Sequence, residues 1–228
     1  MRTESDKRTG YKTDCSDSIS LKNAYKEGKE ILAKAGITEA DLDAWYLLEF
    51  VTGITKARYY MDPDQSMDPE AWKKYKEYLE KRRNHIPLQH ITGSQEFMGL
   101  EFLVNEHVLI PRQDTECLVE LAVEDIRNRK TQNRCESNNT ADRKNEQKVK
   151  VLDLCTGSGC IGISVAKLCP DTEVTLADIS EGALSVAKKN AQNLDAGVTL
   201  IKGNLFENIE GRFDYILSNP PYIPSEVI

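Results

Sequence analysis

The residues best suited to chemistry form the short motif Asn219-Pro220-Pro221-Tyr222, which follows an apolar run of the strand type. Two consecutive prolines cannot continue a hydrogen-bonded ladder, so the chain must leave the strand here in a stiff, extended turn. The side-chain oxygen of Asn219 can accept one N–H of a planar NH2 group, the Pro220 carbonyl can accept the other, and the Tyr222 ring can stack on the flat group. The motif therefore favours chemistry on a conjugated nitrogen, which reacts only when it is held in place.

A second candidate site is a glycine-rich turn. Residues 149–154 are apolar enough for a central parallel strand, and they lead into Cys155-Thr156-Gly157-Ser158-Gly159 and an expected helix over 160–168. Glycines allow the backbone to approach a ligand closely. Asp178 lies nineteen residues after Gly159, at the end of the next expected strand, where a carboxylate can accept both hydroxyls of a ribose. The pattern predicts a site for a cofactor that contains adenosine.

The spacing Gly157-x-Gly159-x-x-Gly162 also matches the dinucleotide fingerprint, so a nicotinamide dehydrogenase is one alternative. Two features favour S-adenosyl-L-methionine instead. Asp153 stands where a carboxylate can organise the pocket for the methionine end, whereas a pyrophosphate prefers neutral glycines at a helix N-terminus. The second feature is the Asn-Pro-Pro-Tyr motif, which suits a methyl acceptor. A dehydrogenase would also need a catalytic acid–base pair, and none accompanies the glycines. We expect methyl transfer to a planar nitrogen, with S-adenosyl-L-homocysteine as the product.

The elements that must position these motifs alternate from residue 149 onward. Strands are expected at 149–154, 173–178, 198–201 and 213–218, with helices at 160–168 and 180–193. This order predicts an α/β fold with a Rossmann-like, doubly wound sheet, whose ligands bind at the carboxyl ends of the strands. Because the chain ends at Ile228, soon after the fourth strand, we expect an incomplete, C-terminally truncated sheet with one edge and its apolar face exposed.

The first half of the chain predicts a different architecture. Residues 1–19 form a polar, flexible tail, and residues 20–85 predict a helical domain. In that domain Gly36 ends the first helix, Thr38 caps the second, and the third spans residues 69–83. Residues 86–112 then predict a linking β-hairpin that turns near Gly99.

The remaining domain, residues 113–228, is expected to begin with a helix over 113–126. Residues 128–147 are almost wholly polar and predict an exposed, mobile insertion.

Composition limits the function classes. Hydrophobic residues make up 39% and charged residues 29% of the chain, which is typical of a soluble globular protein. No membrane-spanning run or signal peptide is present in the sequence, so we expect a cytoplasmic protein. The six cysteines and three histidines show no metal-binding spacing, and no metal is expected. The formal net charge of −7 argues against a general nucleic-acid partner.

At these residues the sequence resembles the class I methyltransferases that carry the N-P-P-Y motif. It is most similar to the protein-(glutamine-N5) methyltransferases of bacterial peptide chain release factors, the PrmC/HemK group. The likeness covers about residues 20–228, and it includes the stretch 109–116, Leu-Ile-Pro-Arg-Gln-Asp-Thr-Glu, which is similar to that group's I-P-R-P-D-T-E signature. It implies that the substrate is the glutamine of a Gly-Gly-Gln loop in class 1 release factors, and that the helical domain helps to dock the factor.

The resemblance also implies roles for single residues. Asn219, Pro220 and Tyr222 are the implied catalytic residues, and the substrate contacts add Pro221, Phe97 and Arg112. The implied cofactor contacts are Asp153, Cys155, Thr156, Gly157, Ser158, Gly159, Asp178, Ile179, Asn204, Leu205 and Asn219.

The sequence departs from the family pattern at several places. Gln113 replaces the usual proline, and Asn204 stands where an acidic residue often contacts the adenine, although an amide can still form a hydrogen bond there. The polar insertion is also longer than usual. Three other functions stay open: methylation of an exocyclic amine of adenine or guanine in DNA or RNA, methylation of a ribosomal-protein glutamine, and binding of a ligand or partner without catalysis.

Overall fold

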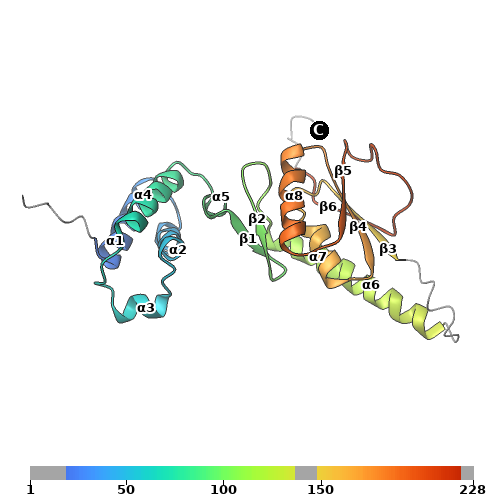
Figure 1. The fold of residues 1–228 in the computed structure, drawn as a ribbon, viewed down its shortest axis with the longest axis horizontal. Coiled ribbons are helices and arrows are strands. Elements are labelled where there is room, and N and C mark those ends of the chain that lie inside the picture. The colour runs from blue at the N-terminus through green and yellow to red at the C-terminus, as the bar shows by residue number, and fades with distance from the viewer. Residues whose placement is uncertain (1–18, 137–147, 222–228) are drawn as a thin grey trace, which may run out of the picture. The chain divides into compact units, whose positions relative to one another are not determined.

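The computed structural model describes residues 19–136 and 148–221, and the chain divides between Ile91 and Thr92 into two compact units (Figure 1). Within the described residues, no helix has the length and apolar character that a membrane crossing requires. The predicted tail and the end of the Asn-Pro-Pro-Tyr motif fall partly outside these residues, because 1–18, 137–147 and 222–228 are not described.

The N-terminal unit is helical, as predicted. Its helices are α1 (Leu21–Lys34), α2 (Ala40–Thr52), α3 (Lys56–Met61) and α4 (Pro69–Arg83), and α5 (Leu88–Thr92) follows at the boundary of the unit. The predicted cap of α2 is wrong: the helix begins after Glu39, whose side chain makes no capping hydrogen bond. Helices α3 and α5 were not predicted, because five or six residues are too few to show a helical period.

Aromatic side chains hold this bundle together. The Tyr75 ring is fully buried, and its hydroxyl donates to the Ala44 carbonyl at 3.0 Å. The Arg82 guanidinium donates to the Asp43 carboxylate at 2.6 Å.

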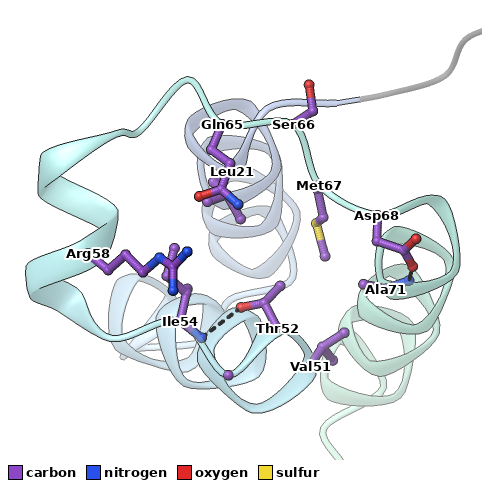
Figure 2. Close-up of a pocket in the computed structure, with 11 residues that line it drawn as sticks. Leu21, Val51, Thr52, Ile54, Arg58, Gln65, Ser66, Met67, Asp68 and Ala71 are labelled. Atoms are coloured by element: carbon purple, nitrogen blue, oxygen red, sulfur yellow. Dashed lines mark hydrogen bonds between the residues drawn. The ribbon is translucent and has the colours of Figure 1, made fainter.

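A hollow of about 500 Å³ lies beside the start of α1. Leu21 of α1, Arg58 of α3 and Met67, in the segment that leads into α4, are among the residues that line it (Figure 2). None of the site residues predicted from the sequence lines this hollow.

The C-terminal unit contains a four-stranded parallel sheet in the order β5-β4-β3-β6. The fold class predicted from the sequence is therefore confirmed. After β5 the chain returns to the far side of β3 and adds β6 there, so the strand order reverses between β3 and β6. A crevice at such a reversal is the usual ligand site of an open α/β sheet. The elements are β3 (Val149–Leu154), α7 (Cys160–Leu168), β4 (Thr172–Asp178), α8 (Glu181–Asn193), β5 (Val198–Lys202) and β6 (Tyr215–Ser218).

Both faces of β3 are buried, which explains its nearly continuous apolar sequence. Val151 belongs to the main core, which includes residues of α7 and α8. On the other face, Leu152 and Leu154 form a smaller cluster against which Ile209 and Phe213 pack. The expectation of an exposed apolar face is thus corrected in part: the exposed fraction is 0% for Leu152 but 53% for Ile216 on β6.

The hairpin of β1 (Ser94–Phe97) and β2 (Leu100–Leu103) turns at Met98 and Gly99, both with positive φ. Two such residues fit a tight hairpin turn, as the sequence predicted. The Phe97 and Phe102 rings meet edge-to-face, 6.1 Å apart, inside the main core of the C-terminal unit. Figure 1 shows β2 beside α8. The hairpin is therefore packed on the sheet unit, although the sequence suggested a linker.

Helix α6 (Glu116–Glu136) follows a 3-10 turn, η1 (Gln113–Thr115), and is longer than predicted. It continues through the first part of the segment 128–147, for which the sequence suggested a mobile insertion. That stretch is rich in Arg, Lys, Gln and Glu, which favour helices on an exposed surface as well as loops. Its polarity indicated exposure to solvent, and it did not exclude a helix.

Candidate active site at the reversal of strand order

The loop after β3 is shaped by backbone conformations with positive φ. Cys155, Gly157 and Gly159 have φ values of 60°, 55° and 82°. Gly159 is the N-cap of α7, and a Cβ atom there would lie 2.7 Å from Cδ1 of Ile163. Glycine at 159 is therefore required both by its φ and by the close approach of α7. The result is an open loop of backbone at the carboxyl end of the central strand.

Asp178, at the end of β4, is held rigidly beside this loop. Its Oδ2 accepts the N–H of Gly157 and its Oδ1 accepts the N–H of Ser180, both at 2.9 Å. Each carboxylate oxygen has a further lone pair, so two ligand hydroxyls can still donate to it. Ile179 follows Asp178 directly, and Leu205 lies shortly after the end of β5. Both side chains are more than half exposed and offer apolar surface.

Asp153 on β3 lies fully buried beneath the loop. Its Oδ2 accepts hydrogen bonds from the Thr156 hydroxyl at 2.5 Å and from the Gly162 N–H at 2.9 Å. Its Oδ1 has no hydrogen-bond partner among the described residues. Burial raises the pKa of this carboxyl from 3.8 to about 6. A buried acceptor without a partner suits a cationic ligand group or an ordered water.

The raised pKa predicts how stability depends on pH. Between pH 4 and 6 the folded state keeps the Asp153 proton that the unfolded chain has lost, so this group makes the free energy of unfolding fall as pH rises. The shift corresponds to about 3 kcal/mol. We expect Asp153→Asn to lose this decline, measured as urea unfolding of both proteins at several pH values from 4 to 7. Parallel curves for the two proteins would contradict the assignment.

The end of β6 brings the second motif to the same place. The Ser218 hydroxyl donates to the Leu154 carbonyl at 2.6 Å, which joins the ends of β6 and β3. The Asn219 side-chain NH2 group donates to the Thr115 hydroxyl at 3.1 Å. Pro220 and Pro221 are exposed, and Tyr222 lies outside the described residues. The structure thus brings together the two motifs that the sequence placed at one edge.

Three residues of the predicted site, Phe97, Arg112 and Asn204, lie outside the two motifs. Phe97 is 1% exposed, so its ring supports the hairpin from the core, and its contact with a substrate stays a prediction. Arg112 is exposed and precedes η1, where its carbonyl accepts the Thr115 N–H at 2.9 Å. Asn204 is exposed in a turn, and its backbone N–H donates to the Glu207 carboxylate at 3.1 Å.

Asn190 on α8 was missed by the sequence analysis. Its side chain is buried and makes three hydrogen bonds: Oδ1 accepts the Leu103 N–H at 2.7 Å, and Nδ2 donates to the carbonyls of Leu103 at 3.0 Å and Ser158 at 2.8 Å. It therefore joins the hairpin to the glycine loop. An asparagine between the buried Ala187 and Ala191 on the apolar face of a helix was the signal that could have identified it.

Removal of this amide should be costly. We expect Asn190→Ala to lower the free energy of unfolding by about 2 kcal/mol, because it leaves buried backbone groups without partners. Urea unfolding measures the change, with Asn193→Ala on the exposed end of the same helix as the control. An equal effect of the two substitutions would show that the hydrogen bonds of Asn190 contribute nothing.

Two family models match the chain. The PrmC N-terminal domain matches residues 23–93, and the methyltransferase small domain matches residues 139–226. These ranges correspond to the helical unit and to the sheet with its glycine loop.

Curated relatives agree with these matches. A release factor glutamine methyltransferase from Moorella thermoacetica is 36% identical over 213 residues, which cover 92% of this chain and 69% of the relative. The chain belongs to the release factor glutamine methyltransferase family. A family member from Geobacter sulfurreducens is 38% identical over 195 residues, or 85% of this chain. A bifunctional methyltransferase from Rickettsia typhi is 37% identical over 208 residues, or 90% of this chain. The matches span only 62% and 40% of these two relatives.

Proposed function

We propose that this family member transfers the methyl group of S-adenosyl-L-methionine to the side-chain nitrogen of a glutamine in a class 1 peptide chain release factor. The observation that carries the proposal is the position of Asn219. It follows β6 at the reversal of strand order, beside the glycine loop, and its NH2 group is engaged by Thr115. Its oxygen is thereby left to accept an N–H of a substrate amide.

The chain's own residues suit S-adenosyl-L-methionine. The Asp178 carboxylate has lone pairs for the two ribose hydroxyls, and the exposed side chains of Ile179 and Leu205 suit the faces of an adenine ring. The unpartnered Oδ1 of Asp153 suits the ammonium group of the methionine end, directly or through a water. The cofactor supplies a methyl group on a positively charged sulfur, which is the electrophile of the reaction.

The difficulty of the reaction lies in the glutamine. An amide nitrogen is a weak nucleophile because its lone pair is delocalised into the carbonyl. Asn219 Oδ1 would accept one of its N–H groups and the Pro220 carbonyl the other, which would raise the electron density at nitrogen and hold the NH2 group in place. Transfer would join this nitrogen to the methyl carbon as the carbon–sulfur bond of the cofactor breaks, and the nitrogen would lose one proton to water. The products are a methylated glutamine and S-adenosyl-L-homocysteine.

The family supports a class 1 release factor as the partner. The relatives are named for methylation of release factors, and the match of residues 23–93 to the PrmC N-terminal domain supports a docking role for the helical unit. Release factors work on cytoplasmic ribosomes in bacteria, so the proposed reaction takes place in the cytoplasm.

Labelled methyl transfer tests the proposal. Purified chain and labelled S-adenosyl-L-methionine are mixed with a class 1 release factor, with the same factor carrying Gln→Ala in its Gly-Gly-Gln loop, with a ribosomal-protein mixture, and with DNA and RNA. Label on the unchanged factor alone supports the proposal. Label on nucleic acid would favour an exocyclic amine as the target, and label on ribosomal protein would favour the alternative glutamine. Cofactor binding without any transfer would contradict the proposed activity for this chain.

A further inference from the structure

The Asn219 amide is hydrogen-bonded to a residue far away in sequence. Thr115 closes the 3-10 turn η1, and its hydroxyl oxygen lies 3.1 Å from Asn219 Nδ2 across 104 residues of chain. Both side chains are partly buried. A side-chain amide has a donor end and an acceptor end, and which end faces the reaction decides whether it can accept from an NH2 group.

Only one orientation of Asn219 is compatible with an amide substrate. If the Asn219 oxygen faced Thr115, its NH2 group would point toward the substrate's NH2 group, and two donors would meet. With the NH2 group donating to Thr115, the oxygen is available to the substrate. We infer that Thr115 is a positioning residue, which sets the acceptor end of Asn219 toward the reacting nitrogen. The inference rests on the proposed function and adds a residue to its site.

Thr115 is well placed for this task because its own position is fixed on both sides. Its N–H donates to the Arg112 carbonyl at 2.9 Å. The next residue, Glu116, accepts the N–H of Met98 in the hairpin turn at 2.7 Å. On the other side of the pair, Ser218 anchors the end of β6 to Leu154. The two chain segments from which Thr115 and Asn219 meet are thus each held by a neighbouring hydrogen bond.

The test compares Thr115→Val, which keeps the shape and removes the hydroxyl, with Thr115→Ser, which keeps the hydroxyl. We expect Thr115→Val to lower kcat for the release factor about 10- to 100-fold, while KM and the Kd of S-adenosyl-L-homocysteine change less than about threefold. Thr115→Ser should restore kcat to within about threefold of the unchanged protein. A purely structural role would instead change cofactor binding and would not be rescued by serine.

A second readout does not depend on turnover. In protein labelled with ¹⁵N-asparagine, the side-chain resonances of Asn219 are assigned by their loss in Asn219→Asp. We expect these resonances to move, and their protons to exchange faster with water, in Thr115→Val and in Thr115→Ala but not in Thr115→Ser. Unmoved resonances, or an unchanged kcat in Thr115→Val, would overturn the inference. If the unchanged protein labels no glutamine, the proposed function fails, and the resonances still decide whether Thr115 orients Asn219.

Discussion

Asn219→Ala should reduce methyl transfer to the release factor by at least about 100-fold, the largest effect expected from any substitution at this site. The alanine removes the acceptor that holds the reacting NH2 group, and it also frees the Thr115 hydroxyl from its partner. The cofactor groups at Asp178 and Asp153 are untouched, so the Kd of S-adenosyl-L-methionine should stay within a few-fold. Initial rates at saturating substrate and calorimetric titration of the cofactor measure the two quantities.

Asn193→Ala is the matched control, because it removes an exposed amide from the end of α8. Its kcat should equal that of the unchanged protein. Turnover by Asn219→Ala at the unchanged rate would remove Asn219 from the mechanism. If cofactor affinity fell in parallel with kcat, Asn219 would act mainly by holding the segment that follows β6 in place.

Asp178→Ala should weaken cofactor binding by about 10- to 100-fold, the second large effect. The carboxylate is expected to accept both ribose hydroxyls, and it also accepts the N–H groups of Gly157 and Ser180. Its removal therefore deletes ligand contacts and releases the glycine loop from its anchor. The change is measured as the Kd of S-adenosyl-L-homocysteine, so that it does not depend on turnover.

Asp178→Asn separates the two causes. The asparagine keeps one acceptor oxygen, but it places an NH2 group where the carboxylate accepted a hydrogen bond. That NH2 group faces the N–H of either Gly157 or Ser180, so thermal unfolding measures the lost anchor while the Kd measures the lost ribose contacts. An unchanged Kd in Asp178→Ala would contradict the ribose assignment.

Patterns within one segment predicted most of the fold. The apolar sequence of β3, the glycines after it and the carboxylate at the end of β4 each lie within a short stretch, and the structure confirms the parallel sheet that they indicate. Pro69 after Asp68 marked the start of α4 correctly, since proline suits the first turn of a helix. Such signals depend on local backbone preferences, which a single sequence displays directly.

The contacts that complete the site could not be predicted in the same way. The partners of Asn219 and Asn190 are Thr115, Leu103 and Ser158, which are separated from them by 32 to 104 residues. No spacing rule links such pairs, because tertiary packing brings them together: β6 joining β3 for Asn219, and the packing of β2 beside α8 for Asn190. The burial of Phe97 was missed for a related reason: an aromatic in a hairpin suits a pocket and a core equally well until the packing partner is known.

The strand order also has a consequence for how the site comes into being as the chain folds. Helices α1, α2 and α4 contact one another within a short stretch of chain, so the contacts of the N-terminal unit are comparatively local. The reversal of strand order is different: β6 must reach the far side of β3 before Ser218 and Asn219 meet their partners. The contact between Thr115 and Asn219 therefore needs a loop closure across 104 residues, and it forms only after β6 has joined the sheet.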